Sequence, residues 1–193
     1  GLSAKAKDAA DVLDAAGFDI VLFETVGVGQ SELDIAKAAD TTVVVLVPES
    51  GDAVQAMKSG LMEIADLFVV NKSDREGADQ AVRALKTILT FRVTHAEDEW
   101  IPPVLNTTAS TTQGIDTLLA EIEVHKAHLE RTGGLRERRI GRERERVHEL
   151  VEAMLRVDFW DAPRRAMLES ELPKVVAHER TSFDLAKDLV ARS

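Results

Sequence analysis

Four residues, Asn-Lys-Ser-Asp at positions 71–74, have the side chains and spacing needed to recognise a purine base. The carboxylate of Asp74 can accept two hydrogen bonds, which matches the N1–H and exocyclic amine of guanine. The stem of Lys72 can lie along the ring face, while Asn71 can tie neighbouring loops together. Adenine offers no matching donor pair, and a pairing left unmade in a closed site is costly. The motif therefore predicts a guanine site, with an ordinary polar turn as the alternative.

A second polar loop, Asn-Thr-Thr-Ala-Ser at positions 106–110, follows the next apolar segment. Guanine-binding proteins place a short loop of this kind beside the base, where its backbone amides touch the ring. We expect Thr108, Ala109 and Ser110 to have this role. Taken alone the segment is only a polar loop, but it supports the guanine interpretation of the motif at 71–74.

A lone acid followed by a glycine loop, Glu-Thr-Val-Gly-Val-Gly-Gln at positions 24–30, suggests a metal and phosphate site. Glu24 could hold Mg²⁺ through a coordinated water, because this ion prefers hard oxygen ligands and keeps several waters. Gly27 could present its backbone N–H to a γ-phosphate, since it has no side chain to obstruct the approach. Gln30 is a candidate for positioning water. A strand end with a glycine turn explains the same residues equally well.

The loops are positioned by apolar segments that alternate with helical ones. Strands are predicted at 19–24, 41–47, 67–70 and 102–106, the second of them central, and helices at 3–16, 31–39, 52–66, 77–94 and 114–130. Strands that are apolar throughout and separated by helices indicate a doubly wound, mainly parallel α/β sheet of the P-loop NTPase type. In such folds ligands bind at the carboxyl ends of the strands, where the polar loops fall.

The character of the chain changes after Arg-Thr-Gly-Gly at 131–134, where strand signals end. The sequence predicts a helix over 140–157 and another over 182–191, with Asp161 as the N-cap of a helix between them. We therefore divide the chain into a partial nucleotide-binding domain, residues 1–132, and a helical arm, residues 133–193. The arm carries an apolar stripe that needs a surface to pack on: Val147, Leu150, Val151, Met154 and Leu155.

Composition excludes several classes of protein. The chain of 193 residues has no cysteine, which rules out disulfides and thiolate-zinc sites, and it has no apolar run long enough to span a membrane. A net charge of −10 argues against general nucleic-acid binding. The run Arg-Glu-Arg-Arg-Ile-Gly-Arg-Glu-Arg-Glu-Arg at 136–146 is better explained as a solvated helix, because glutamates interleave its arginines. His125 and His128 lack an acidic third ligand and suit a helix surface better than a metal site.

Several motifs together resemble the MeaB/ArgK family of G-proteins. They are Glu-Thr-Val-Gly-Val-Gly-Gln-Ser-Glu at 24–32, the segment 49–60, Val-Val-Asn-Lys-Ser-Asp at 69–74 and the glycine-led helix after position 110. The first is the most specific, since ordinary GTPases have aspartate where this chain has Glu24. The resemblance extends over essentially the whole chain.

The resemblance implies a GTPase that uses GTP/GDP and Mg²⁺ and acts as a chaperone of an adenosylcobalamin-dependent acyl-CoA mutase, gating cofactor delivery and protecting the mutase. It also implies that Gly51, Asp52, Gln55 and Lys58 relay the nucleotide state to that mutase. From the residues alone, the same segment is the start of an amphipathic helix. A homodimer joined through the arm and a location in the bacterial cytosol, or in the mitochondrial matrix of a eukaryote, complete the expectation.

The sequence lacks one part of this machinery, because it contains no Gly-Lys dipeptide and hence no Gly-x-x-x-x-Gly-Lys-Ser/Thr phosphate loop. We therefore expect the chain to correspond to the C-terminal part of the family's protein and, by itself, to bind guanine nucleotides only weakly. Two other interpretations stay open. One is a non-catalytic module for dimerisation and partner docking, and the other is a metal-insertion GTPase, although the histidine- or cysteine-rich segments typical of that class are absent.

Overall fold

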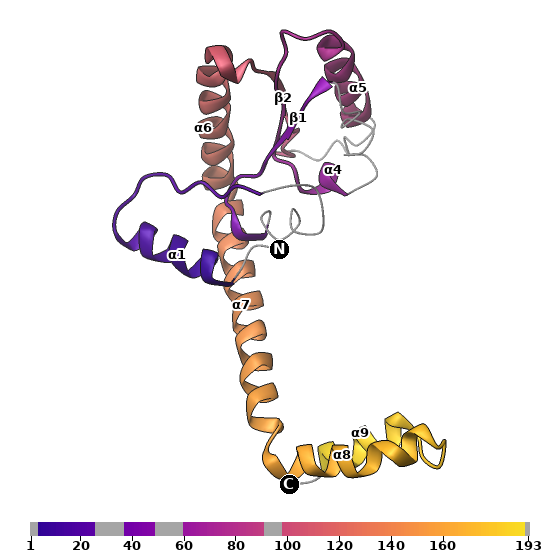
Figure 1. Cartoon of the computed structure of the whole chain (residues 1–193). Coiled ribbons are helices and arrows are strands. Elements are labelled where there is room, and N and C mark those ends of the chain that lie inside the picture. Colours follow the sequence, from indigo (N-terminus) through magenta and orange to yellow (C-terminus); the bar gives the residue numbers. More distant parts are fainter. Residues whose placement is uncertain (1–3, 26–36, 49–59, 91–97, 192–193) are drawn as a thin grey trace. The chain divides into compact units, whose positions relative to one another are not determined.

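The computed structural model describes residues 4–25, 37–48, 60–90 and 98–191 (Figure 1). They belong to two compact units, residues 1–142 and 143–193. No helix in the described ranges has the combination of length and apolar composition that crossing a membrane requires.

The first unit is built on a parallel sheet of three strands in the order β1 (Val43–Leu46), β2 (Leu67–Val70) and β3 (Val104–Asn106). Val43 pairs with Leu67, and Phe68 pairs with Val104. Parallel pairing of apolar strands confirms the predicted α/β fold class. The prediction that the segment 41–47 is the central strand is wrong for the described sheet, in which β2 lies in the middle and β1 at an edge.

The core of this unit lies on the face of the sheet that α5 (Ala78–Thr90) covers. Alternate residues of the strands point to this face, because successive side chains of a strand alternate. The core consists of Val44, Leu46, Met62, Ala65, Phe68, Val70, Ala78, Val82, Leu85 and Leu89. Figure 1 shows α5 and α6 (Ile115–Thr132) on opposite sides of the sheet. A short helix, α4 (Leu61–Ile64), precedes β2 and supplies Met62 to the core.

Residues 19–24 do not form the predicted strand. The helix α1 (Ala4–Ala15) ends before Gly17 as predicted, but the segment after it has no strand structure. Its apolar side chains Phe18, Ile20 and Leu22 are exposed, the last to 87%. A strand needs hydrogen-bonding neighbours, and no described segment pairs with this one. An apolar segment of this composition is therefore buried only where another strand of the described sheet pairs with it.

A buried charged cluster joins the start of β2 to α6 and to the long helix α7 (Gly134–Phe159). Nη1 and Nη2 of Arg138 donate to Oδ2 and Oδ1 of Asp66 at 2.9 and 2.7 Å, and the backbone N–H of Thr42 donates to Oδ2 at 2.8 Å. Nε2 of His125 lies 3.3 Å from Oδ1 of Asp66 but is not aligned for a hydrogen bond. Burial raises the pKa of the Asp66 carboxyl, but the neighbouring His125, Arg138 and Thr42 outweigh it and lower the pKa to about 2.

The imidazole of His125 is fully buried, so the prediction that this residue lies on a helix surface is wrong. Its Nδ1 lies 2.9 Å from Oγ1 of Thr41, and its ring centroid lies 4.8 Å from that of Trp100. Nε1 of Trp100 donates to the backbone oxygen of Asp66 at 2.8 Å. Leu129 and His125 are the most buried residues of α6.

The second unit contains the rest of α7, followed by α8 (Ala162–Val176) and α9 (Ser182–Ala191), which pack on each other. Asp161 caps α8 as predicted, because its Oδ1 accepts the backbone N–H of Arg164 at 2.7 Å. The guanidinium of Arg164 also stacks over the ring of Phe159 at 4.8 Å. Phe159 in turn meets Trp160 edge to face at 5.1 Å. The buried side chains Leu185 and Leu189 of α9 complete this small core.

The apolar stripe of α7 is uncovered within the described part of the second unit. Its side chains are exposed to between 47% and 63%: Val147, Leu150, Val151, Met154 and Leu155. A continuous apolar stripe on an exposed helix marks a surface that gains free energy when another apolar surface covers it. Within the described residues of the second unit, the stripe is therefore not covered by other side chains.

Candidate functional site

The motif at 71–74 forms a tight turn at the carboxyl end of β2. The backbone N–H of Asn71 donates to the carbonyl oxygen of Leu46 at 2.8 Å, so the residue continues the pairing of β2 with β1. Lys72 follows with φ of +56°, a left-handed conformation that is costly for a residue with a Cβ atom. Such outliers persist where surrounding contacts fix the backbone, and they cluster at functional sites.

The loop after β3 lies beside this turn and is bonded to it through Asn71. Oδ1 of Asn71 accepts the hydroxyl of Thr107 and the backbone N–H of Ala109, both at 3.1 Å. The backbone N–H of Ser73 donates to the carbonyl oxygen of Thr107 at 3.0 Å. The two segments that sequence reasoning assigned to one site are therefore adjacent, and Asn71 ties them together as expected.

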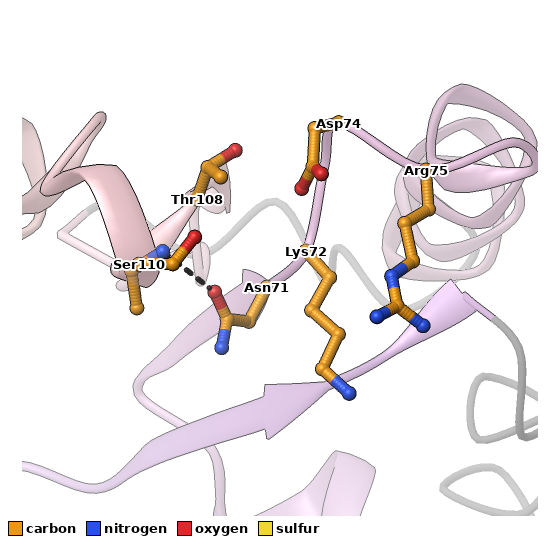
Figure 2. A pocket seen from close by; sticks show the side chains of 7 residues that line it. Asn71, Lys72, Asp74, Arg75, Thr108 and Ser110 are labelled. Carbon is orange, nitrogen blue, oxygen red and sulfur yellow. Dashed lines mark hydrogen bonds between the residues drawn. The ribbon is translucent and has the colours of Figure 1, made fainter.

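A cavity of about 200 Å³ opens between the turn and the loop. It is lined by Asn71, Lys72, Asp74, Arg75, Thr108, Ala109 and Ser110. In Figure 2 the carboxylate of Asp74 turns toward the side formed by Thr108 and Ser110, whereas Lys72 and Arg75 extend together away from that side. The cavity thus has the carboxylate of Asp74 as an acceptor on one side, which suits a ligand with paired hydrogen-bond donors.

Two of the three amides predicted to face a base already have acceptors in the protein. The backbone N–H of Thr108 donates to the carbonyl oxygen of Gln113, and that of Ala109 donates to Asn71, as described above. The third residue, Ser110, lines the cavity. The role of the loop as a donor to a base therefore stays a prediction, centred on Ser110.

Gly114 fixes the loop to the sheet by a close backbone approach. It has φ of +80° and stands at the start of α6. A Cβ atom at this position would lie 2.2 Å from the carbonyl oxygen of Asn106, far inside van der Waals contact. Only glycine allows both the backbone conformation and the distance. The loop at 108–113 is consequently held between the end of β3 and a fixed helix start.

The remaining predicted site residues lie elsewhere or outside the described ranges. Glu24 is exposed in a segment without regular structure. Gly27, Gln30, Gly51, Asp52, Gln55 and Lys58 lie outside the described residues, so their predicted roles stay predictions. Among the residues that the structure describes, no group of three or more histidines and acids could hold a metal ion. The role of Glu24 as a ligand of Mg²⁺ therefore stays a prediction.

Sequence reasoning missed three residues of the site. Arg75 lines the cavity, and Ser73 and Thr107 hold the two loops together. Ser73 occupies the variable position of the motif, and Arg75 follows its last residue, so the motif alone gives them no role. Only the loop segment at 106–110, with its two adjacent threonines, carried a signal for Thr107.

Comparison with known proteins gives consistent results. The family described as methylmalonyl Co-A mutase-associated GTPase MeaB matches residues 1–164. A protein of Pyrococcus abyssi named for GTPase function is 47% identical over 156 residues, which are 80% of this chain and 48% of that protein. The GTPase ArgK of Escherichia coli is 36% identical over 139 residues, 71% of this chain and 42% of that protein.

Solved structures agree with the sequence matches. The crystal structure of an LAO/AO transport system kinase superposes with a TM-score of 0.72 at 28% identity, covering 97% of this chain and 61% of that one. A mitochondrial homologue of the methylmalonic aciduria type A protein from Mus musculus is 36% identical over 60% of this chain. The chain spans about half the length of the curated relatives it matches.

Proposed function

The chain belongs to the MeaB family of GTPases, and on that premise we propose that it supplies the guanine-recognising half of a protein that binds and hydrolyses GTP. The observation that carries the proposal is the cavity between the turn at 71–74 and the loop at 108–110. Asp74 selects guanine by accepting two hydrogen bonds from the base, and Lys72 covers the ring. Asn71 holds the two loops in place.

Fewer observations support the proposed site for the phosphates of the nucleotide. Glu24 would hold Mg²⁺ through a water, and Gly27 would donate its amide to the γ-phosphate, with Gln30 as a candidate for positioning the attacking water. When bound, the ion would neutralise charge on the phosphates. The exposed position of Glu24 is compatible with an ion that keeps its own waters.

Replacing Asp74 by alanine is expected to remove most of the preference of this chain for GDP over ADP. The carboxylate lines the cavity and is the acceptor that adenine cannot satisfy. NMR-detected titration of the 193-residue chain with each nucleotide measures the two dissociation constants. We expect the wild type to bind GDP more weakly than micromolar.

A matched control removes a negative charge two residues further along the chain. Glu76 is exposed and does not line the cavity, so Glu76→Ala should keep the wild-type preference. Equal affinity of the wild type for GDP and ADP would contradict the guanine assignment. A sub-micromolar affinity for GDP would instead show that the chain binds phosphates more strongly than its sequence predicts.

The partner proposed for the protein is an adenosylcobalamin-dependent acyl-CoA mutase, whose cofactor delivery the GTPase would gate and which it would protect. The support is the family itself, whose description names methylmalonyl-CoA mutase. The segment expected to relay the nucleotide state, Gly51 to Lys58, lies outside the described residues. One relative is a bacterial protein and another is a mitochondrial protein of the mouse. These relatives support the bacterial cytosol or the mitochondrial matrix as the location of the protein.

The second candidate function is a module for dimerisation and docking, which the exposed stripe of α7 favours. Burying one Leu or Met side chain stabilises an assembly by roughly 1.5–3 kcal/mol, so five exposed apolar residues on one stripe favour a homodimer. This module could act together with GTP binding or without it. The titration with GDP and ADP separates these two cases.

Replacing Leu150 and Met154 together by aspartate is expected to convert a dimer into a monomer. Both side chains are more than half exposed and lie on the stripe, so a charge there prevents burial against a second copy. Light scattering at tens of micromolar measures the mass. Arg156→Asp, which lies on the opposite side of α7 by the helical period, should leave the mass unchanged. A wild-type chain that is already monomeric would contradict the proposal.

A further inference from the structure

A pair of hydroxyl groups, on Ser73 and Thr108, connects the residue before Asp74 to a residue that lines the cavity. Oγ of Ser73 lies 3.2 Å from Oγ1 of Thr108, which joins the turn after β2 to the loop after β3. The backbone N–H of Ser73 is bonded to the carbonyl oxygen of Thr107 at 3.0 Å. The residue immediately before Asp74 is therefore attached to the loop at two points.

Thr108 is the fixed member of the pair. It is almost fully buried, and its backbone N–H donates to the carbonyl oxygen of Gln113 at 3.0 Å. Its own carbonyl oxygen accepts the hydroxyl of Thr111 at 3.1 Å and the backbone N–H of the same residue at 3.0 Å. A hydroxyl held in this way is a firm anchor for a more exposed partner such as Ser73.

The turn contains a residue in an unfavourable backbone conformation. Lys72 has φ of +56°, a left-handed backbone conformation that is unfavourable for a residue with a Cβ atom. The strained residue stands directly before Ser73, and the functional carboxylate stands directly after it. The contacts of Ser73 thus act at the point where relaxation of the turn would move Asp74.

We propose that Ser73 and Thr108 form a positioning pair that sets how well Asp74 distinguishes guanine from related bases. The inference rests on the proposed guanine site and adds residues to it. A carboxylate can accept the N1–H and the exocyclic amine together only when both of its oxygens lie in the plane of the base. A displaced carboxylate keeps the hydrogen bond to the N1–H more easily than it keeps both hydrogen bonds. Hypoxanthine has the N1–H but lacks the exocyclic amine, so the displacement should weaken its binding less than that of guanine.

The test is a titration of the full 193-residue chain with GDP and with inosine diphosphate, followed by NMR. Ser73→Ala should weaken GDP binding about three- to tenfold, the range that one lost hydrogen bond produces, and should weaken inosine diphosphate binding less. Ser73→Thr keeps the hydroxyl and should restore the wild-type ratio of the two affinities. Thr108→Val should reproduce the effect of Ser73→Ala, and the double variant should add little to either change.

The outcomes separate three situations. If the wild type binds GDP and ADP equally, the proposed guanine site is wrong and the pair has no ligand to select. If the wild type prefers GDP but Ser73→Ala keeps its ratio of GDP to inosine diphosphate affinity, the pair is only structural and the inference is wrong. A change in melting temperature without a change in that ratio likewise contradicts the inference. A reduced ratio that Ser73→Thr restores supports the positioning role.

Discussion

Replacing Asp66 by alanine is expected to lower the free energy of unfolding of the first unit by about 3–5 kcal/mol. Asp66 is 5% exposed, and its carboxylate accepts two hydrogen bonds from Arg138 and one from the backbone of Thr42. Its removal leaves the half-buried guanidinium of Arg138 with only the backbone oxygen of Asp40 as an acceptor, takes the acceptor of the Thr42 amide away, and places His125 beside a void. Urea unfolding followed by circular dichroism measures the change.

Asp40 provides the matched control, because it also pairs with arginines of α7. Its carboxylate binds Arg139 and Arg142 at 2.7 and 2.8 Å but is 36% exposed. Solvent screens such a pair, so Asp40→Ala should cost about 1 kcal/mol or less. Equal losses for the two variants would show that burial of the Asp66 cluster has no special role.

The same buried carboxylate predicts a loss of stability in acid. The pKa of Asp66 is about 2 in the folded protein against an ordinary value of 3.8, so folding favours its ionised form. The stabilisation is complete above about pH 4 and is lost as the pH falls toward 2, by roughly 2 kcal/mol in total. Asp66→Asn cannot titrate, so its stability should vary less with pH across this window than that of the wild type.

Replacing Gly114 by alanine is expected to lower the free energy of unfolding by more than about 3 kcal/mol. The added Cβ atom would lie 2.2 Å from the carbonyl oxygen of Asn106, and both partners are backbone that cannot rotate away. The residue also has φ of +80°, which adds strain for any side chain. The loop at 108–113 would have to shift, so GDP binding should weaken together with stability. Urea unfolding and the GDP titration measure the two effects.

Gly133 separates the steric part of this effect from the backbone part. It ends α6 with φ of +79°, almost the same conformation, but no atom lies within 4 Å of the position where its Cβ would be. Gly133→Ala should therefore cost only about 1 kcal/mol. A similar loss for both variants would show that the contact with Asn106 relaxes easily.

Sequence patterns of a few neighbouring residues correctly predicted the elements that depend on those residues alone. The apolar segment before Asn71 forms a buried strand, and the polar residues after it form the expected turn. Asp161 caps α8 because a short acceptor side chain precedes a helix with proline in its first turn. The proximity of the turn at 71–74 to the loop at 106–110 also followed, since parallel strands bring their carboxyl ends to one edge of the sheet.

The failures concern interactions between distant residues. The segment 19–24 has the composition of a buried strand, but composition does not say whether a neighbouring strand is present to bond it. His125 lies on a helix of mostly polar residues, and its burial depends on Asp66 and Trp100 from other parts of the chain. Asp66 and Arg138 are 72 positions apart, and neither is unusual in its local sequence. The contact between Ser73 and Thr108 likewise joins residues that are 35 positions apart in the sequence.

The two indole rings of the chain give each compact unit its own optical signal. Trp100 packs against His125 and His128 in the first unit, and Trp160 meets Phe159 in the second. The sequence has no tyrosine, so fluorescence excited in the indole band arises from these two side chains. In Trp160→Phe the remaining fluorescence comes from Trp100 and reports the unfolding of the first unit. In Trp100→Phe it comes from Trp160 and reports the unfolding of the second. Thermal unfolding of these two variants therefore shows whether the two units unfold together or one after the other.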